Sequence, residues 1–333
     1  MSKIVFFEVQ DWEKEILQKE FPEAVLSDQK LSIDNASSFS DAEIVSSFIY
    51  SSLTKEVIDT LSRLKLIVTR STGFDHIDIA YCKSKNIAVA NVPEYGSNTV
   101  AEHTFALILT LTRKMYKSVN QAKNLNFDHR EIRGIDVCEK TIGIVGLGKI
   151  GINVLRIAKG FGMKMIVCTR SQKEDLAKQY GFTYVTLDTL LQTADIISLH
   201  VPLNNETKHI INKDNILTCK KGSYLINTAR GGIIDTEAII LGLNKGILDG
   251  VGIDVLEEEK ELNEEIAILT TEYGQDVDLK TLIYNHILIN HPKVIITPHN
   301  AFNSEEALMR IEQTTIENIH SFLEGKLHNT VNG

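Results

Sequence analysis

Side chains that could carry out acid–base chemistry follow predicted strands in the second half of the chain. Arg230 comes after a strand predicted at 224–227, and His299 comes after a strand predicted at 294–297. The acidic run 257–259 follows a strand predicted at 250–255. Ligands of doubly wound sheets bind outside the carboxyl ends of the strands, so we expect these groups at one edge. Together they predict an acid–base site.

A glycine-rich turn lies between a strand predicted at 141–145 and a helix predicted at 150–159. Its glycines, Gly146, Gly148 and Gly151, have the spacing Gly-x-Gly-x-x-Gly. The first allows a tight turn, the second lets the backbone approach a pyrophosphate, and the third lets helix and strand pack closely. The helix N-terminus then faces the phosphates. The position between strand and helix favours dinucleotide binding over the alternative, an ordinary turn.

Apolar runs alternate with amphipathic stretches almost throughout, as expected for parallel sheets covered on both faces. We therefore expect an α/β fold with two doubly wound parallel-sheet domains and a cleft between them, one a Rossmann-type dinucleotide-binding domain and the other a flavodoxin-like substrate domain. The first series of predicted strands is 3–9, 42–48, 64–70 and 87–92, with a helix at 54–62. The second series is 141–145, 164–169, 183–185, 195–201, 224–227, 250–255 and 294–297.

The segment 100–124 has helical periodicity without Gly or Pro and predicts one long helix, which bridges two domains or packs against a partner. We place the substrate-binding domain at 1–99 and 300–333, and the dinucleotide-binding domain at 100–299. A helix predicted at 305–323 would pack back onto the first domain.

Bulk composition excludes several classes of function. The 333 residues include 35 basic and 44 acidic side chains, a net charge of −9, which argues against a nucleic-acid partner. The sequence contains no run of 18 or more apolar residues, so we expect no membrane span. The first residues do not resemble a signal peptide. The four cysteines lack zinc-ligand or redox spacing, so we predict no metal site. A cytoplasmic protein is the simplest interpretation.

Seven motifs, spread over nearly the whole chain, resemble those of the D-isomer-specific 2-hydroxyacid dehydrogenases. They are RSTGFDHID (70–78), NVPEYGSNTVAEH (91–103), GIVGLGKIG (143–151), LHVPLNNETKHIIN (199–212), INTARGGIID (226–235), GVGIDVLEEE (250–259) and ITPHNAF (296–302). Their combination and order are far more specific than any one of them.

The resemblance implies three catalytic residues. Arg230 would hold the substrate carboxylate through a bidentate, charge-assisted clamp, with a structural ion pair as the alternative. His299 would donate a proton to the keto oxygen and accept it in the reverse reaction. Glu259, five positions after Asp254, would pair with His299 and raise its pKa. A neighbour in the acidic run is the alternative, and Glu257 and Glu258 are otherwise interpreted as a solvated face.

The resemblance also implies the binding residues. Backbone N–H groups of Ser71, Thr72 and Gly73 would help to bind the carboxylate, and Tyr95 would lie on the substrate side, unless it is simply a half-buried aromatic residue. Asp254 would lie near the nicotinamide carboxamide, with a cap at the strand end as the alternative. The remaining cofactor contacts would come from Gly146, Gly148, Lys149, Ile150, Gly151, Thr169, Arg170, His200, Val201, Pro202, Thr207, Thr228 and Ala229.

One position favours NADP over NAD. NAD-binding domains usually carry a carboxylate about 20 residues after the glycines, where it binds the ribose 2′-hydroxyl. Thr169 stands there, followed by Arg170. A guanidinium suits a 2′-phosphate, so the sequence leans slightly to NADP and leaves NAD open.

The long connection between Glu259 and His299, together with the phenylalanine of HNAF, resembles the D-lactate dehydrogenase branch. Pyruvate and D-lactate are therefore the expected substrates. The alternatives within the family are a hydroxypyruvate or glyoxylate reductase and a phosphite dehydrogenase. An alternative of another class is a corepressor-like protein that senses NAD. The resemblance also implies a homodimer, with the 100–124 helix as the contact.

Overall fold

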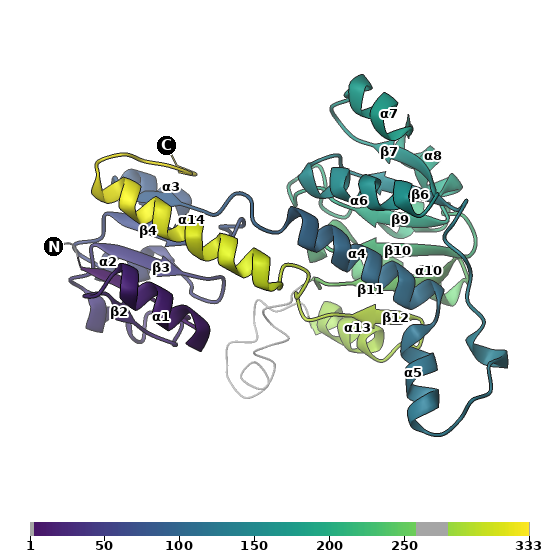
Figure 1. The fold of residues 1–333 in the computed structure, drawn as a ribbon, viewed down its shortest axis with the longest axis horizontal. Coiled ribbons are helices and arrows are strands. Elements are labelled where there is room, and N and C mark those ends of the chain that lie inside the picture. The colour runs from purple at the N-terminus through teal and green to yellow at the C-terminus, as the bar shows by residue number, and fades with distance from the viewer. Residues whose placement is uncertain (1–2, 258–278, 333) are drawn as a thin grey trace. The chain divides into compact units, whose positions relative to one another are not determined.

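The computed structural model describes residues 3–257 and 279–332, and the chain forms two compact units (Figure 1). The first unit is Met1–Gly96 with Asn303–Gly333, and the second is Ser97–Phe302. The chain therefore passes from one unit to the other at 96–97 and at 302–303.

The first unit contains a parallel sheet of five strands in the order β2-β1-β3-β4-β5, as in flavodoxin-like folds. Apolar side chains on both faces, including Phe6, Phe7 and Ile67, are fully buried beneath helices. The strands are β1 (Ile4–Phe6), β2 (Val25–Leu26), β3 (Ile44–Ser47), β4 (Leu66–Thr69) and β5 (Ala88–Ala90). The helices are α1 (Asp11–Glu20), α2 (Lys55–Thr60), α3 (Ile79–Ser84) and α14 (Glu305–Leu323), with a 3₁₀ turn η1 (Ala36–Phe39).

The second unit contains a parallel sheet in the order β12-β11-β10-β9-β6-β7-β8, which is the Rossmann order with one further strand. The strands are β6 (Thr141–Val145), β7 (Lys164–Cys168), β8 (Thr183–Tyr184), β9 (Ile196–Leu199), β10 (Ser223–Asn227), β11 (Leu248–Ile253) and β12 (Val294–Ile296). The helices are α4 (Ser97–Thr112), α5 (Met115–Lys123), α6 (Lys149–Gly160), α7 (Glu174–Tyr180), α8 (Leu187–Thr193), α9 (Lys213–Ile216), α10 (Thr236–Asn244) and α13 (Leu279–Ile289), with 3₁₀ turns η2 (Arg130–Ile132) and η3 (Gly231–Ile233). The predicted fold class, two parallel-sheet α/β domains, is confirmed.

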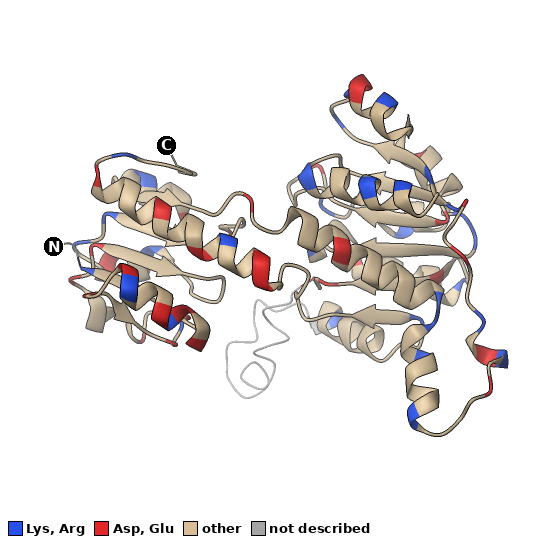
Figure 2. Ribbon diagram, in the orientation of Figure 1, with Lys and Arg blue, Asp and Glu red and all other residues tan. Residues whose placement is uncertain are grey.

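The single helix predicted over 100–124 is wrong, because the segment forms two helices. Lys114, between α4 and α5, has a left-handed backbone with φ of 50°. The carbonyl of Thr112 accepts a hydrogen bond from Ile135 N at 2.9 Å instead of extending the helix. A long-range contact thus ends α4, and the local sequence gives no sign of it. Figure 2 shows that α4 carries almost no charged side chains, since Glu102 is the one Asp, Glu, Lys or Arg in this helix.

Within the described residues, no helix is both long and apolar enough to cross a membrane. The same part of the chain contains no group of three or more His, Cys, Asp or Glu side chains that could hold a metal ion.

A buried charged cluster lies inside the first unit. The side chain of Arg70 is paired with Glu13 at 3.2 Å and also donates to the carbonyls of Phe7 and Glu8. Glu312 on α14 is buried, and among the residues that the structure describes neither of its carboxyl oxygens has a hydrogen-bond partner. Burial, with a further contribution from the charge of Glu13, raises the pKa of Glu312 from 4.5 to about 7.

Replacing Glu312 by glutamine is expected to remove one source of alkaline destabilisation. The folded chain keeps this proton up to a pH of about 7, whereas the unfolded chain loses it near 4.5. Stability therefore falls as pH rises through this window, by up to about 3 kcal/mol. Thermal unfolding should show Glu312→Gln melting above the wild type at pH 8.5 and close to it at pH 5. The exposed Glu317→Gln serves as control, and equal curves for wild type and Glu312→Gln at both pH values would contradict the prediction.

Candidate functional site

The glycine turn leaves open space at the start of α6. Gly146 has φ of +98°, and a Cβ there would lie 2.5 Å from the carbonyl oxygen of His200. A Cβ on Gly151 would lie 2.3 Å from the carbonyl oxygen of Gly146. A Cβ on Gly148, by contrast, would meet no atom of the described residues within 4 Å. The first and third glycines thus serve close packing, and the second leaves the helix N-terminus accessible, which fits a pyrophosphate.

The first turn of α6 begins with an exposed Lys149 and a half-buried Ile150. Thr169 follows β7 and is half-buried, so no carboxylate stands at this strand end. The next residue, Arg170, is exposed, with its Nη1 3.4 Å from Oε2 of the exposed Glu206. Such surface pairs contribute little stability, so Arg170 can exchange this partner for another anion.

His200 and its neighbours shape the turn from the end of β9. The imidazole Nε2 of His200 lies 2.8 Å from Ser198 Oγ, and burial lowers the pKa of this side chain to about 3. His200 is therefore neutral at working pH and has no acid–base role. A Cβ on Gly146 would also lie 2.8 Å from Val201. Thr207 closes the following loop by donating to the carbonyl of Pro202.

The loop that carries Arg230 is braced from two sides. Asn227, at the end of β10 and almost fully buried, donates to the carbonyl of Arg230 at 2.9 Å and accepts from Ala229 N at 3.0 Å. A Cβ on Gly231 would lie 2.1 Å from the carbonyl carbon and oxygen of Leu256. Arg230 itself is half-buried and donates from Nη1 to Ala229 O at 2.8 Å. Asn227 and Gly231 were not among the predicted site residues, although both lie within the motif INTARGGIID.

The turn that carries His299 is organised by Asp254. His299 has a left-handed backbone with φ of 50°, and its N–H donates to the carbonyls of Thr297 and Asp254. The buried carboxylate of Asp254 accepts from the Thr297 hydroxyl, from Asn300 N at 2.8 Å and from Ala301 N at 2.9 Å. This geometry supports the alternative interpretation of Asp254 as a cap. Its cofactor contact stays a prediction.

The acidic run is only partly described. Glu258 and Glu259 lie outside the described residues, so the predicted pairing of Glu259 with His299 stays a prediction. The interpretation of Glu257 as part of a solvated face is wrong. Its Oε1 lies 2.6 Å from His209 Nε2, and its Oε2 accepts from the Thr236 hydroxyl at 2.9 Å. This carboxylate therefore connects the chain after β11 to the loop before α9 and to the first residue of α10.

In the first unit, the residues after β4 form a tight loop. Ser71 is buried and its hydroxyl donates to Gly73 O at 2.5 Å. The Thr72 hydroxyl donates to Val92 O at 2.8 Å, so the segment after β5 holds this loop. Tyr95 is half-buried, and its carbonyl accepts from Arg310 at 2.7 Å. The hydroxyls of Ser71 and Thr72 are thus used in the structure of this part of the unit.

The described candidates fall into two groups. In the second unit, Arg230, Asp254 and His299 follow β10, β11 and β12, which are adjacent strands, and the glycine turn follows β6. Ser71, Thr72, Gly73 and Tyr95 belong to the first unit. The arrangement of the second unit combines an open helix N-terminus with a guanidinium and an imidazole on braced loops, which is suited to proton transfer on a bound anion.

Comparison with known proteins gives consistent matches. Residues 105–301 match the model of the NAD binding domain of D-isomer specific 2-hydroxyacid dehydrogenase. A 2-hydroxyacid dehydrogenase homologue of Zymomonas mobilis is 34% identical over 331 residues, which cover 97% of this chain and 98% of that protein. The D-lactate dehydrogenase of Escherichia coli is 31% identical, with 97% and 98% covered. The crystal structure of D-lactate dehydrogenase from Aquifex aeolicus, complexed with NAD and lactic acid, has a TM-score of 0.88 and 37% identity, and the match covers 99% of both chains.

Proposed function

Because the chain belongs to the D-isomer specific 2-hydroxyacid dehydrogenases, a family of NAD-dependent oxidoreductases, we propose that it interconverts pyruvate and D-lactate. The observation that carries this proposal is the placement of Arg230 and His299 on braced loops after β10 and β12, two strands apart in one sheet. The relatives named D-lactate dehydrogenase, which align over nearly their full length, support the choice of substrate.

In this proposal Arg230 holds the substrate carboxylate, and His299 gives a proton to the keto oxygen. The nicotinamide cofactor, when bound, supplies the hydride that reaches the keto carbon, and in reverse His299 takes the hydroxyl proton. The geometry around Asp254 holds the His299 turn before any substrate arrives, which reduces the reorganisation needed for proton transfer. Glu259 would keep His299 oriented and protonated.

The binding residues complete the proposal. In the first unit, the N–H groups of Ser71, Thr72 and Gly73 would bind the carboxylate, and Tyr95 would contact the substrate. In the second unit, Gly146, Gly148 and Gly151 would cradle the pyrophosphate at the start of α6. The fit of this turn rests on the free space at Gly148 and on the close contacts of the other two glycines.

We propose a slight preference for NADPH over NADH. It rests on the hydroxyl of Thr169 where a carboxylate would exclude a 2′-phosphate, and on the exposed guanidinium of Arg170. Purified protein should reduce pyruvate with NADPH at least as efficiently as with NADH. Thr169→Asp should reverse the ratio of kcat/KM in favour of NADH. A wild type that strongly prefers NADH would overturn the preference but not the activity.

The activity itself is tested with a panel of pyruvate, hydroxypyruvate, glyoxylate and branched 2-oxo acids, each with NADH and with NADPH. We expect the highest kcat/KM with pyruvate and oxidation of D-lactate but not of L-lactate. Absence of turnover with every 2-oxo acid between pH 5 and 9 contradicts the proposed function. A phosphite oxidation assay, run in parallel, distinguishes the proposed function from that of a phosphite dehydrogenase.

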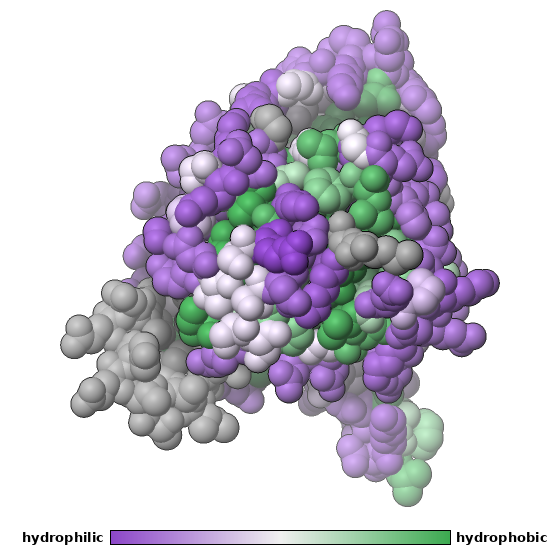
Figure 3. All heavy atoms as spheres, turned by 90° about the vertical axis from the view of Figure 1, so that its left-hand side faces the viewer, coloured by the Kyte–Doolittle hydropathy of each residue, from purple (hydrophilic) through white to green (hydrophobic). Residues whose placement is uncertain are grey.

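We also propose that the protein is a homodimer in which α5 and the loop after it contact a second copy of the chain. No residue of α5 is buried, although it carries several apolar side chains. In the following loop, Leu125 is 84% exposed and Phe127 80%. Figure 3 shows hydrophobic residues at the surface of this projecting segment, at the bottom of the view. Ordered apolar side chains outside the core are typical of an interface.

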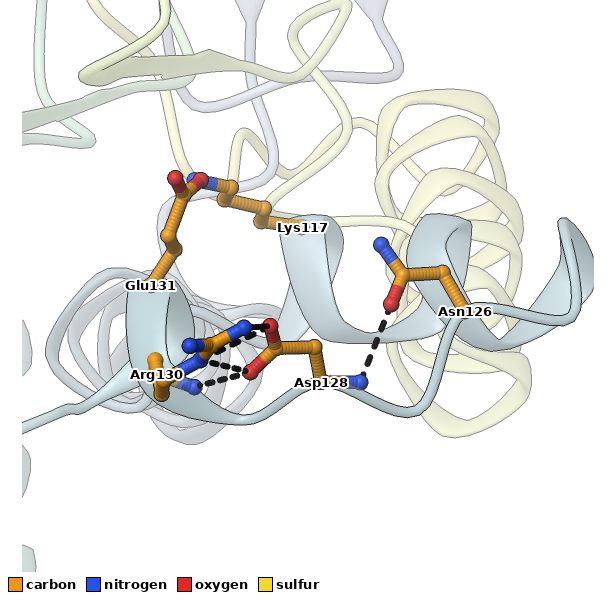
Figure 4. A network of polar contacts seen from close by, with 5 residues as sticks. All are labelled: Lys117, Asn126, Asp128, Arg130 and Glu131. Carbon is orange, nitrogen blue, oxygen red and sulfur yellow. Dashed lines mark hydrogen bonds and ion pairs between the residues drawn. The ribbon is translucent and has the colours of Figure 1, made fainter.

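A local polar network orders this segment (Figure 4). Arg130 Nε lies 2.9 Å from both carboxylate oxygens of Asp128, and Asp128 N donates to Asn126 Oδ1 at 3.0 Å. Lys117 on α5 pairs with Glu131 at 3.0 Å. These contacts hold the loop on either side of Phe127, so that less conformational entropy is lost when a second copy binds.

Phe127→Asp is therefore expected to shift the protein from dimer to monomer. Size-exclusion chromatography with light scattering measures the mass directly. Ile33→Asp, an exposed apolar position of the first unit, is the matched control and should leave the dimer intact. A monomeric wild type would contradict the proposal.

A further inference from the structure

Two adjacent residues of α4 contact the two loops that carry the proposed catalytic groups. His103 Nε2 lies 3.0 Å from Thr297 Oγ1 and 3.5 Å from Asp254 Oδ1, next to the His299 turn. Thr104 Oγ1 lies 3.0 Å from Oγ1 of Thr228, two residues before Arg230. Neither His103 nor Thr104 has a role in the proposed chemistry.

The second hydrogen bond of each threonine hydroxyl determines which group donates in each of the two contacts. The Thr104 hydroxyl donates to Val100 O at 2.8 Å, so its oxygen must accept the proton of the Thr228 hydroxyl. The Thr297 hydroxyl donates to Asp254, so its oxygen must accept from His103, which places the ring proton on Nε2. Both contacts are therefore complete hydrogen bonds with one proton each.

Both contacts are largely shielded from water. Thr104 and Thr228 are buried, as is Asp254, and the side chain of His103 is 19% exposed. Loss of a partner would leave a buried hydroxyl or carboxylate oxygen without its hydrogen bond, so the neighbouring loop must shift or solvate. The two contacts therefore favour the observed positions of the two loops.

The position of α4 in the chain gives these contacts their significance. The helix begins at Ser97, the first residue of the second unit, and the His299 turn ends at Phe302, the last residue of that unit. His103 thus joins the segment that enters the second unit to the segment that leaves it. Thr104, one residue on, joins the same helix turn to the Arg230 loop.

We propose that His103 and Thr104 are positioning residues that hold the Arg230 loop and the His299 turn in a fixed mutual placement. The inference rests on the proposed function, because it assumes that Arg230 and His299 act on the same substrate. Since small misplacements of reacting groups are costly, loss of either contact should lower kcat/KM for the 2-oxo acid far more than it weakens cofactor binding.

The test uses paired substitutions at each position. Thr104→Val removes the hydroxyl at constant shape, and Thr104→Ser keeps it. His103→Leu removes the donor, and His103→Gln keeps an N–H at a comparable distance. Thr112→Val is the matched control, because the Thr112 hydroxyl makes the same bond within α4, to Ile108 O at 2.8 Å, and is equally buried.

We expect Thr104→Val to raise KM for the 2-oxo acid and His103→Leu chiefly to lower kcat, each by about tenfold. The dissociation constant of NADPH should stay within about twofold, and Thr104→Ser and His103→Gln should recover most of the loss. Thr112→Val should change thermal stability alone. If Thr104→Val and Thr112→Val have equal kinetic effects, or if the conservative variants recover nothing, the inference is wrong.

Hydrogen–deuterium exchange separates this inference from the proposed function, because it requires no turnover. Peptides over 228–232 should exchange faster in Thr104→Val, and peptides over 297–301 faster in His103→Leu, with neither changed in Thr112→Val. If the protein has no 2-oxo acid activity but these variants exchange faster, the proposed function is wrong and the positioning role of His103 and Thr104 is supported. Unchanged exchange in an active enzyme would reject the positioning alone.

Discussion

Replacing His299 by asparagine is expected to lower kcat by about 10²–10⁴-fold, because a positioned general acid contributes about that much. Asparagine tolerates the left-handed backbone, φ of 50°, that His299 adopts. The hydrogen bonds from the N–H groups of His299, Asn300 and Ala301 do not use the imidazole, so they survive the substitution. The loss of rate would thus report the missing imidazole and not a collapsed loop.

Steady-state kinetics with saturating cofactor measures this loss, and KM for the 2-oxo acid should change little. His286→Asn, an exposed histidine on α13, is the control and should keep the wild-type kcat. A His299→Asn variant with near-normal kcat would require another proton donor. His200 is not available for that role, since burial lowers its pKa to about 3.

Sequence patterns were sufficient for the sheets, because strands buried on both faces are continuous apolar runs. Strand β6 and helix α14 have the predicted bounds, and the other predicted strands differ by a few residues at their ends. Strand β2, Val25–Leu26, was not predicted. The break between α4 and α5 was missed because it depends on the long-range bond to Thr112 O.

In the candidate site too, features local to the sequence were predicted and features that depend on long-range packing were not. Motifs indicated Arg230 and His299, whose positions after strands are local properties of the chain. The residues that hold these loops, such as Asn227 and His103, could not be assigned, because their partners are set by how strands and helices pack. The interpretation of Glu257 as solvated failed for this reason as well: His209, 48 positions away, pairs with it.

Substituting alanine for Gly231 is expected to abolish most activity and to lower the thermal stability of the protein. The new Cβ would lie 2.1 Å from the backbone carbonyl of Leu256 and 2.4 Å from Glu257 N. Backbone atoms cannot move aside as a flexible side chain can, so either the Arg230 loop or the chain after β11 must shift. Because Arg230 precedes this glycine directly, its guanidinium would move with the loop.

The neighbouring glycine provides the control for this prediction. A Cβ on Gly232 would meet only the Leu203 side chain, at 3.3 Å, which can adjust by a rotation. Gly232→Ala should therefore keep kcat/KM within about threefold of the wild type and unfold at a similar temperature. Equal behaviour of the two variants would show that the contact between the loops after β10 and β11 does not hold Arg230. A loss confined to Gly231→Ala, seen in kcat/KM for pyruvate while cofactor affinity persists, would show instead that close backbone packing keeps the guanidinium in position.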